Sequence, residues 1–129
     1  MKKKPCVCVS FFFAGACFDI DKVSSMGIVP SETRLRDSFK LSYFAHTEWS
    51  VEIVENNCIA VSDVFEKLIN LLDGKQEQIK NICEQDIEAG FVVVIHMEKD
   101  ESLDMTLTRD VIAFAASVNA EIGFDLYYY

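Results

Sequence analysis

The sequence predicts an α+β fold: a mostly antiparallel sheet with helices on one face, ferredoxin-like, in the order βαβ-βααβ-βαβ. Three observations predict it. Short segments alternate between apolar and polar residues with a period of two, as half-buried strands do. Between these segments, apolar residues recur at the spacing of one helix face. The chain has 129 residues, half of them hydrophobic, which suits a single domain over residues 1–129.

The first strand is predicted at residues 6–13, although this region also resembles an export signal. Three lysines at residues 2–4 precede the apolar stretch, and Ala-Gly-Ala follows it at residues 14–16 like a cleavage site. The stretch of about eight apolar residues is at the short limit for a signal, and it alternates like a strand. We therefore expect a strand and a cytoplasmic protein. No other stretch approaches the roughly 20 apolar residues of a membrane span.

The elements up to residue 57 are expected to be short. Asp19 is a suitable N-cap for a short helix, and Gly27 can end that helix in the left-handed conformation. Residues 33–36 are a candidate strand, and residues 37–47 are patterned too weakly for more than a loop or a ragged hairpin. A half-buried strand is expected next, with Trp49, Val51 and Ile53 alternating with the residues between them.

The second half carries the longest helical pattern and two further strands. Asp63 is expected to cap a helix over residues 64–72, and Thr108 a helix that ends near residue 119. The other predicted elements are a helix with Ile79, Ile82, Cys83 and Ile87 on one face that ends at Gly90, an interior strand at 91–97, a short strand at 105–107 and a final strand at 122–128. In that final strand, the expected inward residues are Ile122, Phe124, Leu126 and Tyr128, and the outward ones Asp125, Tyr127 and Tyr129.

The charge distribution limits the classes of partner. The net charge is −9, which argues against nucleic acid or an anionic membrane as the main partner. Residues 1–40 hold seven basic and four acidic side chains, whereas residues 41–129 hold five basic and 17 acidic ones. This acidic stretch is either a solvated surface or a surface for a basic protein partner.

The five cysteines are an odd number without the spacing of a disulfide framework, so free thiols in a reducing compartment are expected. A zinc site would need a second pair of ligands at matching spacing, which neither His46 nor His96 supplies. We therefore expect no metal and no cofactor.

The sequence holds no motif for a nucleophile, a phosphate-binding loop or a dinucleotide site. His46 and Glu48 could act as an acid–base pair, since one residue separates them, but an exposed loop histidine beside a solvated carboxylate is the simpler interpretation. His96 alternates with Val92 and Val94, so we expect it to be a hydrogen-bonded histidine on a packed face rather than a general base.

Two arginines and the C-terminal aromatic residues are the remaining candidates for binding. Arg34 and Arg36 would point to one face of a strand, where they could hold a carboxylate or phosphate or pair with the chain's own acidic surface. Tyr127 and Tyr129, with Trp49 nearby, could form an outer aromatic patch of the kind enriched at interfaces, or they could be ordinary aromatic residues of an edge strand that a loop covers.

Several segments together resemble domain-of-unknown-function family 4279, which comprises small bacterial α+β proteins. The segments are Phe11-Phe12-Phe13 with Asp19 and Asp21, Met26-Gly27-Ile28-Val29-Pro30-Ser31, Trp49-Ser50-Val51, the helix over 64–72, the strand over 91–95, and Ile122-Gly123-Phe124-Asp125-Leu126-Tyr127. A Lys-Gly or Arg-Gly turn is usual in the family after Pro30, and Arg36-Asp37-Ser38 stands here instead. Because the family has no established activity, the resemblance implies a fold and no chemistry.

The leading functional hypothesis is a non-enzymatic module that binds a basic protein, such as an immunity protein that neutralises a toxin. The alternative is a domain that binds an anionic small molecule near Arg34, Arg36, His46 and Trp49. An enzyme that uses His46 and Glu48 is the third hypothesis. A homodimer formed through the open edge of the last strand is compatible with each of them.

Overall fold

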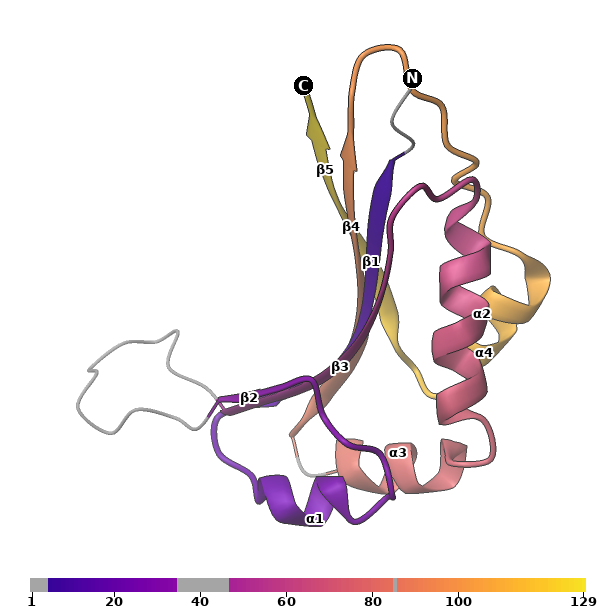
Figure 1. Ribbon diagram of the computed structural model, residues 1–129. Helices are drawn as coiled ribbons and strands as arrows, with labels where there is room; N and C mark the ends of the chain where they lie inside the picture. The colour runs from indigo at the N-terminus through magenta and orange to yellow at the C-terminus, as the bar shows by residue number, and fades with distance from the viewer. Residues whose placement is uncertain (1–4, 35–46, 85) are drawn as a thin grey trace.

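The computed structural model describes residues 5–34, 47–84 and 86–129, and in this part of the chain it shows one five-stranded sheet and four helices (Figure 1). In chain order the elements are β1 (Cys6–Gly15), α1 (Ile20–Ser24), β2 (Glu32–Arg34), β3 (Thr47–Glu55), α2 (Val61–Leu72), α3 (Gln76–Cys83), β4 (Glu88–Met97), α4 (Arg109–Ser117) and β5 (Glu121–Tyr128). The α+β class predicted from the sequence is confirmed.

The sheet has the strand order β2-β3-β1-β4-β5 and is mixed. β1 lies in the centre and pairs antiparallel with β3 and β4, and β2 pairs antiparallel with β3. β5 runs parallel to β4, so the connection between them must cross over, and α4 provides that crossover. The expected mostly antiparallel sheet is therefore corrected to a mixed one, and the ferredoxin-like order is not confirmed.

The strand expected at residues 105–107 is wrong as well. Met105 to Leu107 form no strand, and this region meets the rest of the structure through an isolated parallel bridge between Ala60 and Asp104. The chain there passes the start of α2, where Val61 donates its backbone N–H to the carbonyl of Asp104 at 2.9 Å. The element order observed is thus βαβ, βααβ and αβ.

One face of the sheet carries the core. Alternate residues of β1 are completely buried against the helices, and in Figure 1 α2 and α4 both lie on this side of the sheet. Phe91 of β4 is the hub of an aromatic cluster, because its ring lies 5.1 Å from both Phe11 and Phe65 and 6.4 Å from Phe114. The apolar side of α2, which the sequence predicted from its spacing, packs here through Val64, Phe65, Leu68 and Leu72.

Most of the predicted helix ends are found. Asp19 caps α1 by accepting a hydrogen bond from the Asp21 N–H, and Thr108 caps α4 by accepting one from the Val111 N–H. Gly27 has the expected left-handed conformation, with φ of 89°. The predicted cap at Asp63 is wrong, because α2 begins at Val61, three residues earlier than expected, and its N-cap residue Ala60 forms no side-chain cap.

The N-terminal apolar segment forms β1, as predicted, in the middle of the sheet. Among the residues that the structure describes, no helix has the length and apolar character needed to cross a membrane.

Candidate functional site

The face of the sheet opposite α2 and α4 is left open by these two helices, and we call it the uncovered face (Figure 1). The strand registers place the even-numbered residues of β1, β3 and β4 and the odd-numbered residues of β5 on this face. The sheet curves toward this side at its lower end. The described part of the chain therefore presents a broad, curved sheet surface outside its core.

The centre of the uncovered face is apolar. The tip of the Phe12 ring lies against Gly90 of the neighbouring strand, so close that a Cβ built on Gly90 would stand 2.7 Å from the Phe12 Cζ. Val92 and Val94 follow on β4, and both are half-buried. Because a side chain at residue 90 would displace the ring, glycine at this position keeps Phe12 against the sheet.

Beside this apolar centre, the Cys8 thiol donates a hydrogen bond to Glu52 Oε2 at 3.3 Å. Burial, together with the hydrogen bond to Glu52 and its negative charge, raises the pKa of Cys8 to about 11. A thiol with so high a pKa is protonated near neutral pH and is a poor nucleophile. Cys8 is therefore a polar contact on this face rather than a reactive group.

The border of the uncovered face is acidic. The outward positions of β1, β3, β4 and β5 include five acidic residues and no lysine or arginine. The acidic residues are Glu48, Glu52, Glu88, Glu121 and Asp125. A partner that buries its apolar groups on the centre of this face would therefore be surrounded by a negative potential.

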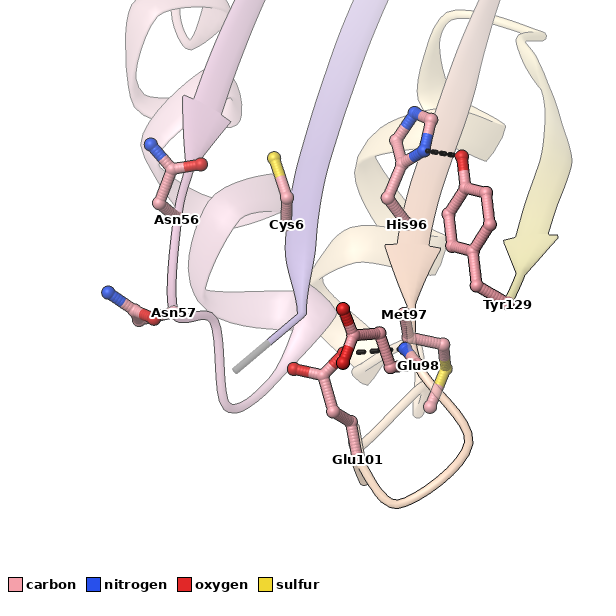
Figure 2. Close-up of a pocket in the computed structure, with 8 residues that line it drawn as sticks. All are labelled: Cys6, Asn56, Asn57, His96, Met97, Glu98, Glu101 and Tyr129. Carbon is pink, nitrogen blue, oxygen red and sulfur yellow. Dashed lines mark hydrogen bonds between the residues drawn. The ribbon is translucent and has the colours of Figure 1, made fainter. Parts of the chain in front are cut away.

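A pocket of about 390 Å³ lies at the end of this face, where β1 begins and β4 ends. Figure 2 shows its lining, which joins residues far apart in the sequence. The lining residues are Cys6, Asn56, Asn57, His96, Met97, Glu98, Glu101 and Tyr129. Cys6 and His96 meet there because the antiparallel register of β1 and β4 places them directly opposite each other, so their side chains leave the sheet on the same side.

His96 is held in place by two tyrosines. Its Nδ1 lies 3.1 Å from the Tyr129 hydroxyl, and its ring stacks on Tyr127 with 4.7 Å between centroids and 8° between planes. The side chain is exposed, so the expectation that His96 lies on a packed face is wrong. The result is a flat aromatic and imidazole surface at the wall of the pocket.

Two carboxylates form the opposite part of the pocket. Glu101 Oε1 accepts a hydrogen bond from the Glu98 N–H, which closes the turn after β4 (Figure 2). Glu101 Oε2 is buried and has no hydrogen-bond partner among the described residues. A buried carboxylate oxygen without a donor is costly, so a donor or cation placed in the pocket would gain from binding it.

The pocket assembles a thiol, an imidazole and carboxylates, but it does not connect them as a nucleophilic site requires. Within residues 5–34, 47–84 and 86–129, no hydrogen bond joins the Cys6 thiol to the His96 ring, and no group of three or more side chains is placed to hold a metal ion. Carboxylates, amide groups and flat aromatic rings together suit the binding of a cationic group.

The structure does not bring the four predicted site residues together. Arg36 and His46 lie outside the described residues, so the proposed His46–Glu48 pair does too. The backbone of Arg34 pairs with Glu48 in the β2–β3 register, and its side chain is not described.

Trp49 is completely buried on the helix-covered side of the sheet. Its ring packs 5.6 Å from Phe13, and its Nε1 donates a hydrogen bond to Ser24 Oγ at 3.2 Å. β3 and β5 are also separated by two strands. The predicted aromatic patch of Trp49 with Tyr127 and Tyr129 is therefore wrong, and His96 takes the place of Trp49 beside the tyrosines.

The alternation within β1 and β4 could have indicated that Cys6 and His96 lie on the outward face of their strands. Their meeting depends on the pairing register of two strands that are separated by about 80 residues, which no local pattern reveals.

Comparison with curated proteins and with solved structures finds no match. The family model described as "Domain of unknown function (DUF4279)" matches residues 4–129, nearly the whole chain and all five strands of the sheet. The resemblance noted in the sequence is thereby confirmed, and the chain belongs to the DUF4279 family.

Proposed function

We propose that this protein is a binding module whose uncovered face receives a basic segment of a partner protein. The observation that carries the proposal is the composition of that face: an apolar centre and five acidic outward residues on β1, β3, β4 and β5, with Arg34 of β2 opposite one of them, Glu48, in the strand register. Interfaces of this kind derive affinity from the apolar centre, and the surrounding charge selects the partner and accelerates its capture.

The pocket at the end of the face suits one lysine or arginine side chain of that segment. Glu101 Oε2 is a buried acceptor without a hydrogen-bond donor among the described residues, and a guanidinium or ammonium group would supply one. The rings of His96 and Tyr129 line the same pocket, and a contact between a cation and the Tyr129 ring is worth about 0.5–2 kcal/mol. The partner would therefore place a basic residue at the end of an otherwise apolar contact.

The net charge of −9 extends this argument to the rate of association. Electrostatic attraction can raise association rates by factors of about 10 to 1,000 at low ionic strength, and salt screens it. Fast capture of a basic protein is what an immunity protein needs against a basic toxin, and this is the finer role that we propose.

The experiment uses two double variants of equal net charge to capture proteins from a lysate of the native host, and it compares what each variant binds. Glu52→Gln/Glu101→Gln removes two charges from the uncovered face and its pocket, whereas Glu66→Gln/Glu77→Gln removes two exposed charges from α2 and α3 on the other side. We expect the first variant to lose at least tenfold in affinity for a basic partner, and the second to bind like the unchanged protein.

The same partner should dissociate faster and associate more slowly as salt rises from about 50 to 500 mM, because the Debye length falls over this range. Equal binding by both double variants, or a partner whose association is indifferent to salt, would refute the proposal.

A further inference from the structure

β5 is an edge strand with unusually exposed apolar side chains. Eleven large hydrophobic residues are exposed in the described part of the chain, and five of them fall within the last six residues. These five are Phe124, Leu126, Tyr127, Tyr128 and Tyr129. A long apolar edge strand is a template for pairing with another strand, and the described chain places none beside it.

The backbone of β5 has its hydrogen-bonding groups arranged for such pairing. The Tyr129 N–H donates to the Met97 carbonyl of β4 at 3.1 Å. Because N–H groups alternate in direction along a strand, the odd-numbered residues of β5 bond to β4. The N–H and C=O groups of the even-numbered residues, from Ile122 to Tyr128, therefore point to the open edge.

We propose that two copies of this chain pair through β5 as antiparallel strands about a two-fold axis. A second copy is the occupant that the edge itself favours, because an isologous contact brings the same apolar strand to both sides. The axis would be perpendicular to the sheet, so the two five-stranded sheets would join into one of ten strands with both uncovered faces on the same side.

The length of the overlap and charge together select the register of this pairing, because axes at Phe124 or Asp125, near the middle of β5, pair the most residues. Residues that lie directly opposite each other in an antiparallel pair point to the same face of the sheet, and faces alternate along each strand. Opposed residue numbers must therefore be both even or both odd, which requires the two-fold axis to lie at a residue that is opposite the same residue of the other copy. An axis at Asp125 would place two aspartates opposite each other, which is destabilising. An axis at Phe124 instead pairs Phe124 with itself, Ile122 with Leu126, and Asp125 with Gly123, and it overlaps the strands from residue 120 to 128.

The area suits a weak, reversible dimer. Within the paired residues 120–128, the exposed fractions are 45% for Phe124, 49% for Tyr127 and 58% for Tyr128. With about 200 Å² for each aromatic side chain, these three leave roughly 300 Å² exposed per copy. Two copies with Leu126 and the backbone edge would bury at most about 800–1,000 Å², which is the size of small, transient interfaces and suits micromolar or weaker affinity.

The test is sedimentation equilibrium of the full chain from about 1 to 500 μM. We expect a monomer–dimer equilibrium that Phe124→Glu weakens at least tenfold, because it opposes two carboxylates across the axis. Leu71→Glu on α2 is the matched control, since Leu71 is also 45% exposed and the charge change is equal. We expect it to leave the equilibrium unchanged, and circular dichroism checks that each variant is folded.

Two further variants test the strand pairing itself. Leu126→Pro removes an N–H that points to the open edge and leaves the bonds to β4 in place, so it should weaken the dimer without unfolding the monomer. Phe124→Cys should form a disulfide-linked dimer on oxidation, because opposed Cα atoms about 5.5 Å apart lie within bridging range. Leu126→Cys should not do so above the background of the unchanged chain, because Leu126 faces residue 122.

A 14.6 kDa species at every concentration would overturn the proposal. So would a dimer that Phe124→Glu and Leu126→Pro leave intact, or one that Leu71→Glu weakens as much as Phe124→Glu does. Cross-linking of Leu126→Cys rather than Phe124→Cys would overturn the register.

Discussion

Phe11 and Phe12 are neighbours in β1 and lie on opposite faces of the sheet, so they offer a direct measurement of how differently the two faces are packed. Phe11 is completely buried and contacts the rings of Phe13 and Phe91, each with centroids 5.1 Å away. Phe12 lies on Gly90 at the uncovered face and is half-buried. We predict that Phe11→Ala destabilises the protein far more than Phe12→Ala.

The magnitudes follow from what each ring leaves behind. Removal of the Phe11 ring opens an enclosed cavity between the sheet and the helices, and such substitutions cost about 3–5 kcal/mol. Removal of the Phe12 ring opens a surface that water can fill, so the lost burial amounts to about 1–2 kcal/mol. A domain is stable by about 5–15 kcal/mol in total, so Phe11→Ala should leave a marginally stable fold.

Urea denaturation, followed by circular dichroism, measures the free energy of unfolding of the unchanged chain and of both alanine variants. Phe11→Leu provides a variant that remains folded if Phe11→Ala does not, with an expected loss of about 1–2 kcal/mol. Equal losses for Phe11→Ala and Phe12→Ala, to within about 0.5 kcal/mol, would mean that the two faces are covered alike, and the account of the uncovered face would be wrong.

Three further predictions concern single contacts. Gly90→Ala should destabilise the chain by about 1 kcal/mol, because the new Cβ meets the Phe12 ring at 2.7 Å. In a Phe12→Ala background the same substitution should cost nothing, and a double-mutant cycle in urea measures this coupling. Cys8 should be alkylated slowly at pH 8, which mass spectrometry after timed alkylation measures. Since the folded pKa of Cys8, about 11, exceeds the ordinary thiol pKa of 9.0, the contribution of Cys8 to stability should be present below pH 9 and lost as the pH rises toward 11; urea titrations of the unchanged chain and of Cys8→Ser test this. Thr108→Ala should cost about 1 kcal/mol through loss of the α4 cap, whereas Ser102→Ala in the exposed turn should cost less than about 0.5 kcal/mol.

The sequence predicted the covered face of the sheet well, because burial there follows the periodicity of each element. Val7, Val9, Phe11 and Phe13 alternate in the sequence and are all completely buried. The helical spacing in α2 likewise identified the side that packs on the sheet. Local alternation suffices when the strand is central and a helix lies over it.

β5 shows where the same reasoning fails. The register with Val93 and Ile95 places Phe124 and Leu126 on the helix side, as predicted, yet both are about half exposed. Alternation tells to which side a residue points, but whether a helix extends over that side depends on the lengths of α2 and α4 and on the strand order. The pocket could not be predicted for a similar reason, because Cys6 and His96 lie opposite each other only through the pairing register of β1 and β4.

The central position of β1 also constrains how the chain is made. β1 is the first strand to leave the ribosome, but both of its neighbours come later, and the second, β4, is complete only at Met97. Until then a strand with three consecutive phenylalanines has at least one open edge, and nascent chains in that state are prone to aggregate. Pairings between residues so distant in sequence also form slowly. Synthesis of this protein should therefore depend on protection of β1 until β4 is made, and overproduction should yield inclusion bodies more readily than the stability of the finished fold would suggest.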